Sequence, residues 1–67
     1  MISIQCNGKK RELRRGTSIA ALVEELGLRD RKFAVERNRK VVPRDRLDTE
    51  LLEDGDDVNI VTLVGGG

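Results

Sequence analysis

A single stretch of this chain has helical spacing, and that limits the folds open to it. Its apolar residues are Ile19, Leu22, Val23 and Leu26. Intervals of three and four residues place them on one face of a helix. Thr17 or Ser18 can cap the free amides at its start, and Gly27 can supply the left-handed backbone that ends it. With one helix available, strands must bury the remaining apolar residues, so we expect a sheet covered on one face by that helix.

The N-terminal segment has the alternation of a half-buried strand followed by a hairpin. Apolar and polar side chains alternate over residues 2–6. Asn7-Gly8 then favours a two-residue turn, because both residue types tolerate positive φ angles. The returning strand covers residues 9–13. It places Arg11 on the apolar face, where its aliphatic stem can lie along the edge of the core with the charged head in water.

Three further strands are expected in the second half of the chain. They cover residues 33–37, 40–42 and 58–64. Pro43 suits the end of an edge strand, whereas the β-branched run 58–64 is expected to be the central strand. Between them, residues 44–52 are expected to form a loop with one helical turn. Its expected core anchors are Leu47, Leu51 and Leu52. The predicted fold class is α+β, with one mixed sheet of four to five strands.

The composition leaves the core to aliphatic side chains. The 67 residues include one cysteine and no histidine, so neither an internal disulfide nor a Cys/His metal cage is expected. We therefore expect no bound metal or cofactor. Cys6 shares the face of Ile2 and Ile4, which predicts a small buried apolar residue rather than a reactive thiol. No signal peptide or membrane-spanning run is recognised, so a cytoplasmic protein without a membrane partner is expected.

Charge is unevenly distributed along the chain. Residues 9–15 carry a net charge of +4, residues 29–46 one of +5 and residues 48–57 one of −6. The basic segments could contact phosphates, but Phe33 is the only aromatic residue and offers no platform for stacking bases. The acidic segment opposes a general basic surface. No nucleic-acid partner is therefore expected. The charge segregation can reflect a solvated surface or can steer the protein toward partners.

The printed sequence finishes with three glycines directly after the apolar run. Gly65, Gly66 and Gly67 have no side chains to clash, so such a tail can enter a narrow active site on another protein. Because no acid–base motif is visible, the terminal carboxylate is the group best suited to covalent chemistry. A frayed terminus and the remnant of a tag are the alternatives. We expect residues 1–64 to form the domain and residues 65–67 a flexible tail.

The order of these features resembles the ThiS/MoaD family of sulfur carriers, which have the ubiquitin-like β-grasp fold. The matching segments are Asn7-Gly8, Gly16-Thr17-Ser18-Ile19, Leu22-Val23-Glu24-Glu25-Leu26, Ala34-Val35-Glu36-Arg37-Asn38, Val41-Val42-Pro43-Arg44, Leu52-Glu53-Asp54-Gly55-Asp56, Val58-Asn59-Ile60-Val61 and Val64 with the terminal glycines. Each segment alone is weak evidence, but their order and spacing along the whole chain are specific. Two positions depart from the family pattern: Arg11 replaces a usual apolar residue, and Gly65 adds a third glycine.

The resemblance implies a sulfur carrier for thiazole formation in thiamine biosynthesis. A ThiF-like adenylating enzyme would use ATP to join the Gly67 carboxylate to AMP. Sulfur from a donor such as a cysteine desulfurase would then displace the AMP. The resulting thiocarboxylate would deliver its sulfur to a ThiG-like thiazole synthase. The chain would thus be a co-substrate and not an enzyme, with Gly66 and Gly67 in the reactive role. Gly65 would extend the reach of the tail or make no specific contact.

The apolar strand before the tail offers candidates for docking on these partners. Val58 and Ile60 are expected in the core. Val61, Leu63 and Val64 are the candidates for docking, since apolar groups left exposed near the tail would form a patch.

Several other functions fit the same fold. The small subunit of molybdopterin synthase and carriers for cysteine formation or tRNA thiolation would share the chemistry of Gly67 and differ in the acceptor. Protein conjugation, as in ubiquitin, would join Gly67 to a lysine. A plain β-grasp interaction module would still work without Gly66 and Gly67, whereas a carrier would not.

Overall fold

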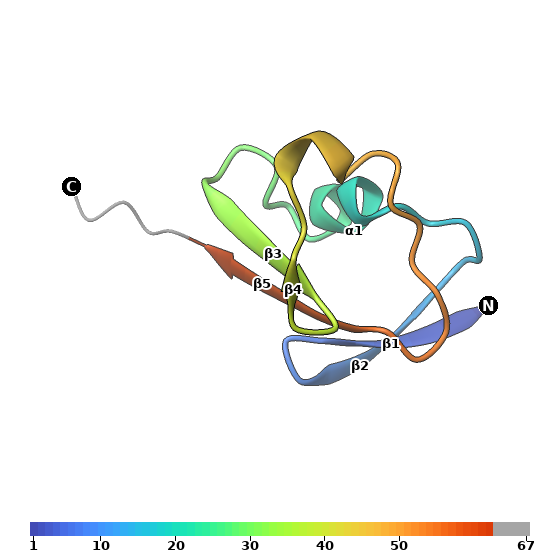
Figure 1. Cartoon of the computed structure of the whole chain (residues 1–67). Coiled ribbons are helices and arrows are strands. Elements are labelled where there is room, and N and C mark those ends of the chain that lie inside the picture. Colours follow the sequence, from blue (N-terminus) through green and yellow to red (C-terminus); the bar gives the residue numbers. More distant parts are fainter. Residues whose placement is uncertain (63–67) are drawn as a thin grey trace.

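The computed structural model of the protein describes residues 1–62 (Figure 1). Within this part, the elements are β1 (Ile2–Cys6), β2 (Lys9–Leu13), α1 (Ile19–Glu25), β3 (Phe33–Arg37), β4 (Lys40–Val41), the 3₁₀ turn η1 (Arg44–Arg46) and β5 (Asp57–Thr62). Every predicted element is present in this part, and the last two residues of the strand expected over 58–64 lie outside the described residues. The helical turn expected within residues 44–52 is η1.

The strands form one mixed sheet with the order β2-β1-β5-β3-β4 (Figure 1). The neighbours β1 and β5 are parallel, and the other neighbouring pairs are antiparallel. The β-branched run is therefore the central strand, as predicted, and β4 lies at an edge. The helix α1 covers one face of this sheet, which leaves the other face open in the described part of the chain.

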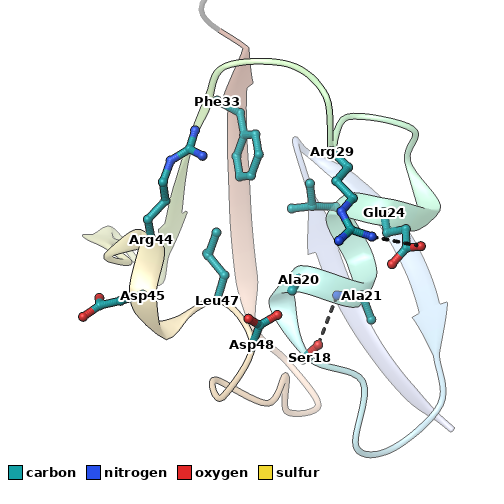
Figure 2. A pocket seen from close by; sticks show the side chains of 11 residues that line it. Ser18, Ala20, Ala21, Glu24, Arg29, Phe33, Arg44, Asp45, Leu47 and Asp48 are labelled. Atoms are coloured by element: carbon teal, nitrogen blue, oxygen red, sulfur yellow. Dashed lines mark hydrogen bonds and ion pairs between the residues drawn. The ribbon is translucent and has the colours of Figure 1, made fainter.

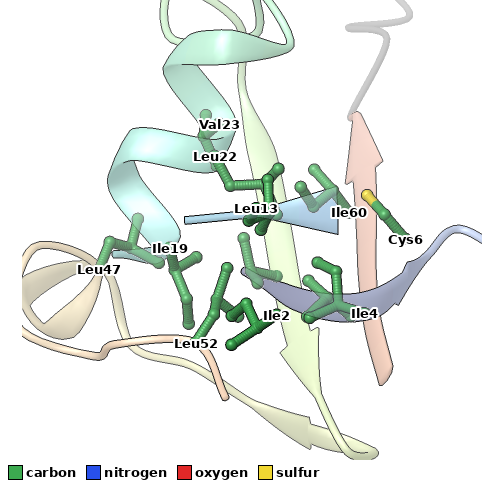
Figure 3. Packing of buried hydrophobic residues seen from close by; sticks show 12 residues of the cluster. Ile2, Ile4, Cys6, Leu13, Ile19, Leu22, Val23, Leu47, Leu52 and Ile60 are labelled. Atoms are coloured by element: carbon green, nitrogen blue, oxygen red, sulfur yellow. The ribbon is translucent and has the colours of Figure 1, made fainter. Parts of the chain in front are cut away.

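Aliphatic side chains fill the space between the sheet and α1. The buried cluster consists of Ile2, Ile4, Cys6, Leu13, Ile19, Leu22, Val23, Val35, Leu47, Leu52, Val58 and Ile60. In Figure 3, Ile19 and Leu22 of α1 point toward side chains of the strands. Burying each of the large aliphatic residues stabilises the fold by about 1.5–3 kcal/mol. The prediction of an aliphatic core is confirmed.

The first hairpin has the register that its two-residue turn predicts. Cys6 lies opposite Lys9 and Ile4 opposite Arg11. Both turn residues have positive φ angles, 52° at Asn7 and 81° at Gly8. Arg11 lies on the face toward the helix, and its Nη2 contacts Glu25 Oε1 of α1 at 3.3 Å. The charged head is thus partly exposed beside the core, as its position in the sequence predicted.

Polar groups mark both ends of α1. The backbone N–H of Ala21 donates to Ser18 Oγ at 3.0 Å, so Ser18 is the N-cap. The Thr17 hydroxyl instead donates to the carbonyl of Arg14 at 2.7 Å. Gly27, directly after the C-cap Leu26, has a φ of 73°. The predicted glycine stop is therefore confirmed, and of the two candidate caps Ser18 is the one used.

One of the predicted core anchors in the second half of the chain was wrong. Leu51 was expected to anchor the core, but it is 50% exposed, whereas the adjacent Leu52 is buried. The segment is extended there: Leu52 N–H donates to the Thr17 carbonyl at 2.8 Å. Neighbouring side chains of an extended segment point in opposite directions, so only one of the pair can face the core.

The strand expected over 40–42 is one residue shorter. β4 ends at Val41, although the N–H of Val42 still donates to the Val35 carbonyl at 2.9 Å. Pro43 has no N–H with which to continue the ladder.

Across residues 1–62, none of the helical segments has the length and apolar character needed to cross a membrane. Nor does this part of the chain bring together three or more His, Cys, Asp or Glu side chains in a way that could hold a metal ion.

Candidate functional site

The candidate site lies where β5 leads into the C-terminal residues. Most residues proposed for it lie outside the described part of the chain: Leu63, Val64, Gly65, Gly66 and Gly67. Their roles, and the division into a domain over 1–64 and a tail over 65–67, stay predictions. The structure describes the strand that precedes these residues, as far as Thr62, and everything that holds that strand in place.

β5 is held on both sides by neighbouring strands. Its register with β3 pairs Val61 with Ala34 and Thr62 with Phe33. On the other side it runs parallel to β1, with Val58 opposite Cys6. Val58 and Ile60 are buried, as predicted. β5 is therefore fixed, as far as Thr62, by ladder hydrogen bonds and by the core.

The side chain of Asn7 also forms hydrogen bonds to β5, which the sequence did not predict. The N–H of Ile60 donates to Asn7 Oδ1 at 2.8 Å, and Asn7 Nδ2 donates to the Ile60 carbonyl at 3.3 Å. The backbone N–H of Asn7 also donates to the Val58 carbonyl at 2.9 Å. The side-chain amide thus takes the place of a peptide group and extends the β1–β5 ladder beyond β1. The sequence signal was only that of a turn residue.

A cluster of charged and polar groups surrounds Arg37 at the start of β5. Arg37 Nε donates to Asp56 Oδ2 at 2.9 Å, and Arg37 Nη1 donates to Glu50 Oε1 at 2.9 Å. A third contact joins Arg37 Nη2 to Glu53 Oε1 at 3.3 Å. Asn38 Nδ2 donates to Asp56 Oδ1 at 3.0 Å. We call Arg37, Asn38, Glu50, Glu53 and Asp56 the Arg37 cluster.

The surroundings of Asp56 keep it charged although it is only 7% exposed. Burial alone would raise the pKa of this carboxyl, but hydrogen bonds from the Glu53 backbone, from Asn38 and from Arg37 outweigh burial and hold the pKa below its ordinary value. Burial likewise opposes the charge of Arg37, yet bonds to Asp56 and Glu50 raise its pKa. The cluster ties the β3–β4 turn to the start of β5, so its role is to hold the fold together.

Val61 lies on the face of the sheet that α1 leaves open. It is 56% exposed. Its cross-strand neighbour on the same face is Ala34, which is exposed. Val41 of β4 lies opposite Glu36 on this face as well and is 69% exposed. We call Ala34, Val41 and Val61 the outer patch. The exposure of Val61 agrees with the expectation of an apolar group near the tail, and its docking role remains a prediction.

The single cysteine is not positioned for chemistry. Cys6 is 8% exposed and packs in the core (Figure 3). Burial raises the pKa of its thiol, an effect that the charge of Arg11 only partly offsets. A raised pKa keeps the thiol protonated and therefore a poor nucleophile.

A hollow of about 670 Å³ opens between α1, η1 and the beginning of β3 (Figure 2). Its base is apolar, with Val23 and Leu47 among the lining residues. The guanidinium of Arg44 lies 5.1 Å from the centre of the Phe33 ring. Across the hollow, Arg29 and Glu24 form an ion pair at 3.6 Å. Charges of both signs line the rim, and the Ser18 hydroxyl at its edge accepts the hydrogen bond from Ala21 N–H.

The sheet order, the single covering helix and the central strand leading to the C-terminal residues define a ubiquitin-like β-grasp protein. Within this class, the chain matches one protein family. The model of the ThiS family matches residues 4–67, nearly the whole chain. The chain belongs to the ThiS family.

Individual relatives agree with this membership. The crystal structure of the thiamine biosynthesis protein ThiS from Geobacter metallireducens superimposes with a TM-score of 0.83 at 26% identity, covering 98% of this chain and 100% of that one. A thiazole synthase of Paramagnetospirillum magneticum is 41% identical over 61 residues, which cover 91% of this chain and 19% of that protein. The uncharacterized protein ycf40 of Porphyra purpurea is 33% identical over 66 residues, which cover 98% of this chain and 93% of that protein. The chain thus spans about one fifth of the thiazole synthases it matches, 19% and 20% of their lengths.

Proposed function

We propose that this chain is a sulfur carrier, whose Gly67 carboxylate is converted to a thiocarboxylate that donates sulfur for thiazole formation in thiamine biosynthesis. The observation that carries the proposal is the ThiS family match, which runs from residue 4 to residue 67 and so includes the three glycines. The likeness to the thiamine biosynthesis protein of Geobacter metallireducens supports the same pathway. The proposal requires a free carboxylate at Gly67.

The chemistry explains why such a carrier needs partner enzymes. A carboxylate resists substitution because its leaving group would be oxide. When a carboxylate oxygen attacks the α-phosphate of ATP, pyrophosphate leaves and an acyl adenylate forms. A sulfur nucleophile then attacks the carbonyl carbon, and AMP leaves. The adenylating enzyme supplies positioning and charge stabilisation, so the carrier contributes a reachable carboxylate and no catalytic group.

Three partners follow from this scheme. A ThiF-like enzyme would bind ATP and adenylate Gly67, and a donor such as a cysteine desulfurase would supply the sulfur. A ThiG-like thiazole synthase would accept it, and the similarity to two thiazole synthases supports that partner. ATP would be held by the adenylating enzyme, and neither a nucleic acid nor a membrane takes part. All of these steps would take place in the cytoplasm.

The outer patch would dock the domain on the adenylating enzyme. Val61 is exposed on the open face of the sheet and is followed after one residue by Leu63 and Val64, the other docking candidates. An exposed apolar group beside the reactive tail would let one contact surface both bind the domain and align the tail. Glu36 and Asn59 lie next to the patch on the same face and would belong to its polar rim.

The test is the intact mass of the protein after incubation with ATP, a ThiF-like adenylating enzyme and sulfide. We expect a mass gain equal to the replacement of one oxygen by sulfur. Two controls should show no gain: a variant lacking Gly66 and Gly67, and a variant with one alanine appended after Gly67. No gain in the parent chain, with the enzyme active on its own carrier, would overturn the proposal. A gain that survives deletion of the glycines would place the sulfur elsewhere.

A further inference from the structure

The second edge of the sheet is formed by β2, and its outward backbone groups have no partner among residues 1–62. Cys6 and Lys9 flank the two-residue turn and form a hydrogen-bonded pair. From that pair onward, every second residue of β2 exchanges backbone hydrogen bonds with β1. Lys9, Arg11 and Leu13 bond to β1. The N–H and C=O groups of Lys10 and Glu12 therefore point away from the sheet. Among the backbone hydrogen bonds that residues 1–62 form outside the strand ladders and helices, none involves Lys10 or Glu12. A further strand could add at this edge.

A groove lies directly beside this edge. It is a hollow of about 390 Å³ between β2 and the C-terminal end of α1. Leu26 and Leu28 provide half-buried apolar side chains, and Lys9, Lys10 and Arg11 line the opposite side. A strand added to β2 would direct every second side chain to the helix-covered face, where the leucines lie. The groove therefore suits a peptide with apolar residues at alternate positions.

The charge of this region determines what kind of peptide fits. Residues 9–15 have a net charge of +4. Lys9, Lys10, Arg14 and Arg15 are exposed, and none of them forms an ion pair with another described residue. Arg11 is bound to Glu25, yet its Nε is buried without a hydrogen-bond partner within residues 1–62. This Nε is out of reach of a ligand, whereas the excess of exposed positive charge favours carboxylates.

The same charges disfavour a second copy of this chain at the edge. Two β2 strands side by side would bring two sets of basic side chains together, and Lys on an edge strand is a common protection against self-association. The free edge and the groove thus fit a foreign acidic segment better than a copy of β2.

We infer that β2 and the groove beside it bind an extended acidic peptide segment of a partner protein, which adds to the sheet as a further strand. The backbone of the peptide exchanges hydrogen bonds with Lys10 and Glu12. Its apolar side chains pack on Leu26 and Leu28, and its carboxylates meet Lys9 and the neighbouring basic residues. This binding site lies apart from the outer patch and does not depend on the glycine tail.

The experiment is a titration of the ¹⁵N-labelled protein with the capped peptide Asp-Asp-Val-Ile-Val-Val-Glu-Glu, followed by amide chemical shifts. We expect saturable shifts confined to β2 and to the groove residues Leu26 and Leu28. The matched control peptide carries lysine in place of each acidic residue and should cause no shift. A second probe peptide is N-methylated on alternate amides. Methylation of the set that faces β2 should abolish binding, whereas methylation of the other set should leave it unchanged.

Variants of the protein separate charge from backbone pairing. Lys10→Ala removes one charge at the edge and should weaken binding by about threefold, as expected for an exposed ion pair. Lys10→Pro also removes the outward N–H and should weaken binding by about tenfold or more. Lys40→Ala makes the same change in net charge on the other edge strand and should leave the affinity unchanged.

Three results would overturn the inference. The first is the absence of shifts at millimolar peptide. The second is binding that tolerates both N-methylated peptides, because it would then not use the strand edge. The third is a concentration-dependent dimer that broadens the β2 signals without peptide, because the edge would then bind a second copy. Sulfur loading is not measured in any of these arms, so the outcome is independent of the carrier proposal.

Discussion

The two ends of β5 differ in how the chain holds them. At its start, the Arg37 cluster surrounds a buried Asp56 with donors from three residues, Arg37, Asn38 and Glu53. At its end, Val61 is exposed on the open face, and the strand leads into the glycine-rich residues. Polar interactions thus concentrate at the end away from the tail. In a carrier of the proposed kind, this division would anchor the start of β5 and leave Val61 at its other end accessible to partner enzymes.

The largest loss of stability is expected from a change at the start of β5. Asp56→Asn removes the charge opposite Arg37 and turns an amide N–H₂ toward groups that all donate hydrogen bonds. We expect the free energy of unfolding to fall by about 3 kcal/mol, in the range for breaking a buried ion pair. Urea denaturation measures this. Asp48→Asn makes the same charge change at an exposed residue and should cost about 0.5 kcal/mol or less. Equal losses in both variants would contradict the assigned role of the cluster.

The contribution of Asp56 should also depend on pH. Its pKa in the folded protein lies below the ordinary value of 3.8. The stabilisation is therefore complete above the unfolded pKa and is lost as the pH falls through the folded pKa. The difference in unfolding free energy between the parent protein and Asp56→Asn should be constant near neutral pH and should shrink below about pH 4. Denaturant midpoints across this range test the sign, and a difference that grows in acid would refute it.

An intermediate effect is expected at Asn7, which holds the middle of β5. Asn7→Asp removes the Nδ2 donor and places a carboxylate oxygen near the Ile60 carbonyl, so we expect a loss of about 2 kcal/mol in unfolding free energy. Asn7→Gly keeps the positive φ of the turn but loses both side-chain bonds, and should cost about 1 kcal/mol. The order of the two thermal midpoints is the decisive measurement. A stability of Asn7→Asp equal to that of the parent would show that the amide does not hold β5.

The smallest effect on stability, and the clearest effect on activity, is expected at the open end. Val61→Asp changes an exposed side chain and should alter the unfolding free energy by about 0.5 kcal/mol or less. Sulfur loading by the adenylating enzyme should slow by about tenfold, the equivalent of 1.4 kcal/mol of docking energy. Leu51→Asp is the matched control, because Leu51 is equally apolar and 50% exposed outside the outer patch. Unchanged loading of Val61→Asp would exclude the outer patch as the docking surface.

The fold could be predicted from the sequence because its signals are local. The alternation in residues 2–6, the Asn7-Gly8 turn and the helical spacing up to Gly27 each depend on neighbouring residues, and all three are confirmed. Leu51 was assigned wrongly because hydropathy alone cannot tell which of two adjacent leucines faces the core. That choice was made by the hydrogen bond from Leu52 to Thr17, a residue far away in the sequence.

The features that hold β5 in place could not be predicted in this way. Arg37 and Asp56 are 19 residues apart, and Asn7 and Ile60 are 53 apart, so their pairing appears only once the sheet has formed. In the site itself, the sequence indicated an exposed apolar group at Val61, and the structure adds its neighbours Ala34 and Val41. The assignments at Leu63, Val64 and the three glycines lie outside the described residues and stay predictions.

The burial of Cys6 has a practical consequence for following the proposed chemistry. A thiol that is 8% exposed and has a raised pKa reacts slowly with alkylating reagents. In the folded protein, an iodoacetamide-type label would therefore mark a newly formed thiocarboxylate and pass over the cysteine. The chain has no second cysteine, so the label would count loaded molecules directly, without any mutation of the carrier.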